Sequence, residues 1–459
     1  MTKEEINLLI DNQRKYFKKG NTLDVNKRRN KLIALKKCIK ENENKLLDAL
    51  YKDLGKSKTE GYMCEIGLVY EEINYMVKNI KKFSKPQRVK TPLAQFIAKS
   101  YQIPSPYGVV LIMSPWNYPF LLSFDPIVEA YAAGNTIVFK PSRYSYNTNI
   151  VMKEILESVF TKDECITIFG GHEENEILIN SDVDYIFFTG SKQVGKIVYN
   201  ACANKLIPVT LELGGKSPCI VDETANIKLA AKRIIFGKLI NTGQTCVAPD
   251  YIYCHKDIKD KLVEEFIKQI KLQYGDDPIN NPTFGHIITK RHFDRVVSLI
   301  NPNKVVYGGK YNEELLKIEP TILDNVDKSD LVMGEEIFGP ILPIMTYDNI
   351  EEVIDYVNNN DLPLACYYFS TSKKNIRYAQ NRIQFGGGCI NDTIIHLATS
   401  HMSFGGVGAS GVGSYHGKKG FEAFTHYKSI VDKKNIIDLP MRYQPYKSKN
   451  EKLIKMFMK

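Results

Sequence analysis

Cys246 has the setting of a reactive thiol. It lies in NTGQTCVAPD (241–250), among small and polar neighbours, just beyond an amphipathic segment. The chain has nine cysteines. Four of the others lie inside apolar runs, as small core hydrophobes do: Cys165, Cys219, Cys254 and Cys366. A lone loop cysteine is more often structural than catalytic, so the interpretation depends on its partners.

Two polar residues at strand ends supply candidate partners. Glu212 ends the apolar run VTLEL, immediately before a Gly-Gly turn. A buried carboxyl there would have a raised pKa, as a general base needs, although a glutamate facing water would give the same pattern. Asn117 follows the run GVVLIM, at the place where open α/β sheets bind ligands. Its amide could stabilise an oxyanion, or it could only cap the next helix.

Two further strand ends suggest a phosphate-containing ligand. Lys140 closes NTIVFK, and FFTGSKQVG (187–195) predicts a strand, a tight turn and a helix start. Backbone amides at that helix start could bind a phosphate. The spacing from Gly190 to Gly195 is not the G-x-G-x-x-G dinucleotide fingerprint, so the motif is weak by itself.

These strand ends belong to a repeated α/β pattern. Short continuous apolar runs alternate with amphipathic segments from 108 to 215, and a second such series follows. Runs of this kind are typical of strands buried on both faces, which predicts parallel sheets with crossover helices. Residues 3–82 are expected to be helical, and 85–107, with four prolines, to leave the body as extended chain or a hairpin.

Composition excludes several other classes. The 459 residues carry a net charge of +10, but the basic residues are dispersed and no nucleic-acid module accompanies them, so no nucleic-acid partner is expected. No run reaches the ~18 apolar residues of a membrane span. The cysteines form no CxxC pair, which argues against zinc and disulfides and predicts no metal and a reducing, cytoplasmic location.

Taken together and in order, the motifs resemble the aldehyde dehydrogenase superfamily. The resemblance rests on SPWNYP, KPS, FTGS, LELGGKSP, GQTC, EEIFGP and FGGVGASGVGSYHG, which span about 110–417. INDTIIH (390–396) and SYHGKKGFEAFTHYKS (414–429) look like the class 3 branch, which includes fatty and aromatic aldehyde dehydrogenases. The resemblance implies NAD(P)-dependent oxidation of medium- or long-chain aliphatic or aromatic aldehydes to acids, and a homodimer.

The resemblance also implies roles at matching positions. Cys246 would be the nucleophile that forms a thiohemiacetal and then a thioester, Asn117 and the Cys246 N–H the oxyanion hole, and Glu212 the base. The remaining positions would contact the cofactor: Lys140, Glu336, Gly190, Ser191, Gly195, Phe338 and Trp116. Tyr118 could line the aldehyde tunnel.

The implied fold is α/β, with a Rossmann-like cofactor domain, an α/β catalytic domain and a small β bridging arm. We expect the cofactor domain at 1–84 and 108–210, and the catalytic domain at 211–420. The arm would take 85–107 and 421–440, and 441–459 would form a tail. Strand-like SIVDKKN (429–435) could seek a partner subunit.

One position departs from many NAD-preferring relatives. They carry a glutamate three residues after the lysine, where this chain has Arg143. A guanidinium would bind the 2′-phosphate that a carboxylate repels, so NADP use is expected unless Arg143 turns to solvent. Three other readings stay open: a CoA-acylating dehydrogenase, which typically lacks the glutamate; a cofactor-independent cysteine hydrolase; and a non-enzymatic protein.

Overall fold

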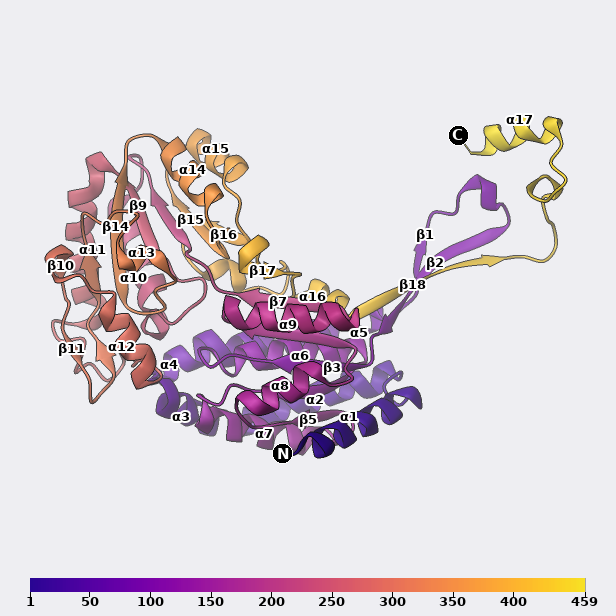
Figure 1. The fold of residues 1–459 in the computed structure, drawn as a ribbon, viewed down its shortest axis with the longest axis horizontal. Helices are drawn as coiled ribbons and strands as arrows, with labels where there is room; N and C mark the ends of the chain where they lie inside the picture. The colour runs from indigo at the N-terminus through magenta and orange to yellow at the C-terminus, as the bar shows by residue number, and fades with distance from the viewer. Residues whose placement is uncertain (459) are drawn as a thin grey trace.

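The computed structural model describes residues 1–458 and contains two α/β sheets and a projecting β arm (Figure 1). The first sheet has six strands in the order β17-β7-β6-β3-β4-β5, all parallel except the edge strand β17. Its strands are β3 (Val109–Met113), β4 (Thr136–Lys140), β5 (Cys165–Thr167), β6 (Tyr185–Gly190), β7 (Val209–Leu213) and β17 (Gly411–Val412).

Helices cover both faces of this sheet, which is why its strands are apolar throughout. In β3, Val109, Leu111 and Met113 pack with α1, α8 and α9, whereas Val110 and Ile112 pack with α2, α3, α5, α6 and α7. The helices are α1 (Lys3–Lys18), α2 (Val25–Glu41), α3 (Glu43–Leu54), α4 (Lys58–Gly61), the π-helix η1 (Tyr62–Ile66), α5 (Gly67–Phe83), α6 (Leu121–Ala133), α7 (Tyr146–Val159), α8 (His172–Asn180), α9 (Lys192–Lys205) and α16 (Gly417–Ala423).

The second sheet has seven strands in the order β10-β13-β14-β9-β8-β15-β16. Only the β10–β13 pair is antiparallel among these described strands. They are β8 (Pro218–Val221), β9 (Tyr251–His255), β10 (Val305–Tyr307), β13 (Thr321–Leu323), β14 (Ile341–Tyr347), β15 (Ala365–Phe369) and β16 (Gly387–Ile390). Around them lie α10 (Ile227–Leu239), α11 (Lys259–Tyr274), α12 (Lys290–Ser298), α13 (Leu331–Gly334), α14 (Ile350–Asn359), α15 (Lys373–Arg382) and the ribbon β11 (Tyr311–Asn312) and β12 (Lys317–Ile318).

The arm extends away from both sheets and carries the tail helix at its far end (Figure 1). It consists of β1 (Gln87–Val89), β2 (Ala98–Pro106) and β18 (Thr425–Lys433), followed by α17 (Ser448–Phe457). Short 3₁₀ turns complete the chain: η2 (Leu93–Gln95), η3 (Ile240–Gly243), η4 (Lys256–Ile258), η5 (Pro302–Lys304), η6 (Ile395–Leu397), η7 (Gly408–Ser410) and η8 (Pro440–Arg442). Within residues 1–458, no helix combines the length and apolar character that crossing a membrane requires.

Candidate active site

Cys246 follows a strained turn between the two sheets. Asn241 and Thr242 in η3 have φ angles of 51° and 56°, a region that a β-branched residue such as Thr242 rarely adopts. The buried Gln244 side chain holds this turn: its amide donates to the carbonyl of His286 at 3.0 Å, and its oxygen accepts from the Ile288 N–H at 3.0 Å. Strain that is held in place in this way is a feature of functional loops.

Asn117 is tied directly to the turn that carries Cys246. It follows β3, is 3% exposed, and its Nδ2 donates to the carbonyl of Gln244 at 3.0 Å. Its own carbonyl accepts from Asn241 Nδ2 at 2.8 Å. An amide nitrogen carries two hydrogens, so the Gln244 contact orients the group and leaves the second hydrogen for an oxygen atom in the neighbouring cavity.

Glu212 is a buried carboxyl on β7. It is 3% exposed, and neither of its oxygens has a hydrogen-bond partner in the described part of the chain. Burial therefore raises the pKa of Glu212 well above its usual range. Burial thus favours the neutral form of the carboxyl, which can take part in proton transfer once it ionises.

Two cavities of opposite character meet at Cys246. The larger cavity, of about 540 Å³, has charged as well as apolar residues in its wall, among them Trp116, Glu212 and Glu336, and is called the polar cavity below. A smaller cavity, of about 150 Å³, has an apolar wall. Both share the residues Cys246, Leu122, Phe404 and Tyr415. Burial, with repulsion from the Glu336 and Glu212 carboxylates, raises the pKa of the Cys246 thiol to about 12.

The polar cavity brings together most of the residues expected to contact the cofactor. Its wall contains Trp116, Gly190, Ser191, Glu336 and Phe338. Ser191 is the N-cap of α9, where its hydroxyl accepts from the Val194 N–H at 3.4 Å, so the cavity borders a helix N-terminus. Gly195 lies inside α9, where a Cβ would sit 2.5 Å from Leu213; its place in the structure is in the close packing of α9 on β7.

Lys140 and Arg143 lie outside that wall, at the carboxyl end of β4. Lys140 is 3% exposed, and its Nζ donates to the carbonyls of Pro141 at 3.0 Å and Gly170 at 2.9 Å. Arg143 is exposed, and its guanidinium lies 5.2 Å from the ring centroid of Tyr144. A Cβ on Gly171 would lie 3.4 Å from Arg143 Nη1. The two cations therefore border the same Gly170-Gly171 turn.

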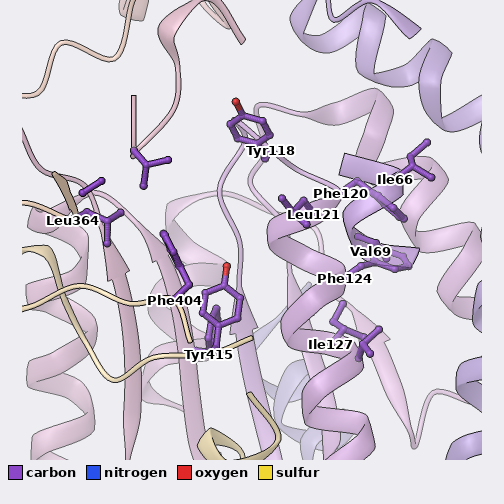
Figure 2. Close-up of a cluster of buried hydrophobic side chains, with 14 of the residues drawn as sticks. Ile66, Val69, Tyr118, Phe120, Leu121, Phe124, Ile127, Leu364, Phe404 and Tyr415 are labelled. Atoms are coloured by element: carbon purple, nitrogen blue, oxygen red, sulfur yellow. The ribbon is translucent and has the colours of Figure 1, made fainter. Parts of the chain in front are cut away.

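The apolar cavity includes Tyr118, the residue expected to line an aldehyde tunnel. The Tyr118 hydroxyl is 2.6 Å from Thr245 Oγ1, beside Cys246. Figure 2 shows Phe404 and Tyr415 next to each other, both on the side of this region where Leu364 lies. The remaining wall comes from distant segments: Met63, Cys64 and Leu68; Phe236 and Ile240; and Ile394, Ile395, Leu397 and Ala398.

Sequence reasoning missed several residues that position these groups. Arg295 donates to the carbonyls of Glu336 at 3.1 Å and Ile337 at 2.6 Å, and so holds the segment that carries Glu336 and Phe338. Asp250 accepts from the Ile337 N–H at 2.9 Å. His292 lies 5.1 Å from the Trp116 ring, between centroids. Only the combined motifs, not charge or periodicity, could have pointed to them.

The polar cavity suits a dinucleotide. Glu336 Oε1 is buried and has no hydrogen-bond partner among the described residues, as expected for a group that would bind a sugar hydroxyl. A Cβ on Gly214 would lie 2.0 Å from Glu336 Oε2, so only glycine permits this approach. The α9 N-terminus offers backbone amides to a phosphate. Trp116 and Phe338 present aromatic surface to a flat ring.

The two sheets and the thiol at the junction of two cavities fit an NAD(P)-dependent oxidoreductase acting on aldehydes, and the comparison with known proteins shows that this is the class of the protein. Residues 1–430 match the profile described as "Aldehyde dehydrogenase family". The chain belongs to the aldehyde dehydrogenase family, and NAD or NADP is its cofactor.

Individual relatives agree with this family assignment. The chain is 47% identical over 446 residues to "4,4'-diaponeurosporen-aldehyde dehydrogenase" of Staphylococcus aureus (strain NCTC 8325 / PS 47), covering 97% of each chain. It is 42% identical to "Aldehyde dehydrogenase, dimeric NADP-preferring" of Canis lupus familiaris, covering 96% of this chain and 98% of the relative. The structure described as "Substrate bound state of Staphylococcus Aureus AldH" matches with a TM-score of 0.97 and 45% identity, covering 99% of each chain. The predicted α/β fold and family are thus confirmed.

Proposed function

We propose that Cys246 is the nucleophile of this aldehyde dehydrogenase and that Asn117 and Glu212 assist it. One observation carries the proposal: Cys246 lies where the polar and apolar cavities meet. An aldehyde carbon in the apolar cavity would be within reach of its sulfur. When bound, the dinucleotide supplies the hydride acceptor.

Each residue has a distinct task in this proposal. The Cys246 sulfur adds to the aldehyde carbon, and the Asn117 amide and the Cys246 N–H donate hydrogen bonds to the oxyanion that forms. Glu212 accepts a proton from the thiol or from the water that hydrolyses the thioester. Because burial raises the pKa of both Cys246 and Glu212, ionisation of these groups is part of the barrier.

We further propose aldehydes with a hydrocarbon chain or aromatic ring as substrates. The wall of the smaller cavity is almost entirely aliphatic or aromatic, and burying such a group contributes about 0.8 kcal/mol per CH₂. The name of the Staphylococcus aureus relative, "4,4'-diaponeurosporen-aldehyde dehydrogenase", supports the same substrate class.

NADP use is proposed on the position of Arg143. Its exposed guanidinium stands beside the buried Lys140 at the Gly170-Gly171 turn, so an anionic phosphate there would meet two cations. The Glu174 carboxylate, which accepts from the Gly171 N–H at 2.7 Å, borders the same turn. The relative from Canis lupus familiaris, described as NADP-preferring, supports this choice.

Domain roles, assembly and location are also proposals. The six-stranded body (1–84 and 108–210) would bind the cofactor, and 211–420 would form the catalytic domain, although β17 at 411–412 pairs with β7 of the first sheet. The arm (85–107 and 421–440) has β18 at its edge, open to pairing in a homodimer. All nine cysteines are free, which supports a reducing, cytoplasmic setting.

A direct assay tests the proposed reaction. The protein is incubated with hexanal or benzaldehyde and NAD or NADP, without CoA, while reduced cofactor and carboxylic acid are measured. We expect equal amounts of both products. A requirement for CoA would identify an acylating dehydrogenase instead, and thioester or ester hydrolysis without any cofactor would identify a cysteine hydrolase.

A further inference from the structure

A fully buried ion pair lies beneath the loop that carries Asn117. The side chains of Lys56 and Glu65 are 1% and 0% exposed and contact each other. Lys56 Nζ also donates to the carbonyl of Asn117 at 2.8 Å and lies 3.9 Å from the ring centroid of Tyr118. Lys56 precedes α4 and Glu65 lies in the π-helix η1, about 50 to 60 residues before the loop they contact.

Glu65 holds the other end of the same loop. Its Oε2 accepts from the N–H groups of Phe120 at 2.8 Å and Leu121 at 3.2 Å. These amides begin α6, whose N-cap residue, Phe120, makes no side-chain capping bond. The first amides of a helix need partners and favour a negative charge. The Glu65 carboxylate supplies both the acceptor and the negative charge. Together, Lys56 and Glu65 therefore hold residues 117–121, from the Asn117 carbonyl to the start of α6.

A neighbouring carboxyl holds the turn that carries Cys246. Glu60 Oε1 accepts from the Asn241 N–H at 2.7 Å. The Asn241 side chain in turn donates to the carbonyls of Asn117 at 2.8 Å and Gln244 at 3.0 Å. The Asn117 carbonyl thus receives Lys56 and Asn241 together, and its amide points at the Cys246 turn.

Stability alone is a weak reason for this arrangement. A buried ion pair is often no more stabilising than well-packed apolar residues of the same size, and the surroundings are already apolar: Figure 2 shows Ile66 and Val69 packed near Phe120 and Phe124. Burial raises the pKa of Glu65, and Lys56 and the two α6 amides oppose that rise. Apart from their mutual contact, every polar contact of the pair goes to the Asn117 loop.

We propose that Lys56 and Glu65 are positioning residues for the oxyanion donor, setting the height and direction of the Asn117 amide relative to Cys246. The inference rests on the function proposed for Asn117. An error of about 1 Å in the placement of a catalytic group can lower a rate about 100-fold. The pair would therefore act on turnover while leaving the cofactor cavity unchanged, since neither residue is part of its wall.

The test replaces Lys56 by methionine, which keeps the length of the side chain without its charge. We expect Lys56→Met to lower kcat at saturating substrates roughly 10- to 100-fold, with the Kd for NADP within about twofold of wild type. Rates are expressed per NADP-binding site, counted in the same titration, so unfolded protein does not count. Glu65→Gln, which keeps the size of the side chain, should lower kcat less, and Lys56→Arg should restore part of the rate.

A matched control removes an ion pair far from the loop. Lys259 and Asp324 pair at 2.9 Å at the outer side of the second sheet, and both side chains are mostly buried. Lys259→Met should lower the melting temperature and leave kcat unchanged. If Lys56→Met also lowers only the melting temperature, the pair is structural and the inference is wrong.

A double-mutant cycle separates this inference from the proposed function. Because Lys56 acts through Asn117, Lys56→Met should change kcat less than about threefold in an Asn117→Ala background. An undiminished effect there overturns the inference. If Asn117→Ala itself keeps full turnover, the proposed oxyanion role fails instead. Should Lys56→Met not fold, the same cycle is run with Glu65→Gln, and its outcomes decide in the same way.

Discussion

The two cavities that share Cys246 differ in almost every physical respect. The larger one has Glu212, Glu336, Arg295 and other charged residues in its wall. The smaller has an almost continuous apolar wall, in which the hydroxyl groups of Tyr118 and Thr245 contact each other at 2.6 Å. Because the two cavities meet at Cys246, one sulfur can be reached by two ligands of opposite chemistry, each bound by its own cavity wall. The difference also explains why the thiol is hard to ionise: the apolar side removes water, and the polar side offers carboxyls.

The largest expected effect tests the junction itself. Cys246→Ala should lower the rate of aldehyde oxidation about 10⁴-fold or more, since removal of a covalent nucleophile has effects of that order. Cys64 is the matched control, because it lines the same apolar cavity. Cys64→Ala should stay within about threefold of wild type. Steady-state rates of NADPH formation decide, and equal losses in both variants would remove the distinction between the two thiols.

Asn117→Ala comes next. Loss of one oxyanion donor lowers turnover about 100- to 1000-fold. The Kd for NADP, measured by fluorescence titration, should remain within about twofold, because the change removes one side-chain amide, held by the Gln244 carbonyl, from a large cavity wall. Turnover equal to wild type would exclude Asn117 from the mechanism.

The pH dependence of Cys246 alkylation tests how completely water is excluded from the thiol where the two cavities meet. Burial and the nearby carboxylates raise the pKa of Cys246 to about 12. A thiol titrating so high is almost wholly protonated at neutral pH, and its thiolate fraction grows about tenfold for each pH unit below the pKa. In the cofactor-free protein, alkylation of Cys246 by iodoacetamide should therefore accelerate about 100-fold from pH 7 to pH 9. A plateau in that range, in peptide mass spectra, would mean a solvated thiol.

Charge reversal at Arg143 tests whether this guanidinium makes the enzyme prefer NADP over NAD. Arg143→Glu should lower kcat/KM for NADP roughly 10- to 100-fold, the range of one or two charge-assisted hydrogen bonds, and change the value for NAD less than about threefold. Arg377→Glu, at an exposed position on α15, controls for the change in net charge. A strong preference of the wild-type enzyme for NAD would contradict the NADP proposal.

The smallest expected effect is the dependence of kcat/KM on the length of the aldehyde chain that the apolar cavity would bind. In a series of straight-chain aldehydes, kcat/KM should rise about fourfold for each added CH₂ until the chain fills the cavity, because each buried CH₂ contributes about 0.8 kcal/mol. An aldehyde of equal length with a terminal carboxylate should react poorly. A flat series would show that the substrate does not use this wall.

The sequence was most informative where one physical signal dominates. Continuous apolar runs predicted buried parallel strands, and β3, β4, β6 and β7 have that character. Polar residues directly after or at the ends of such strands, Asn117 and Glu212, do lie beside Cys246 in the same cavity wall. Parallel strands end at one edge of a sheet, so these positions had to converge.

The parts that could not be predicted depend on long-range contacts. Lys56 lies between α3 and α4 and Glu65 in η1, and in the sequence both look like ordinary surface residues. Both are nevertheless buried under a loop about 60 residues away. Phe404 and Tyr415 lie in the glycine-rich stretch FGGVGASGVGSYHG, where no signal in the sequence marked them as cavity residues, but they form part of both cavity walls. The positive φ of Asn241 and Thr242 also has no sequence signature.

The most direct test of the central claim is a search for the acyl group on Cys246. The full-length enzyme is mixed with NADP and a hydrophobic aldehyde, quenched in acid within the first turnover, digested and analysed by mass spectrometry. The account predicts that the peptide containing Cys246 gains the mass of the acyl group, and that Cys246→Ser protein treated in the same way carries no thioester. Acid formed at the normal rate with no acyl group on Cys246 at any quench time would contradict it.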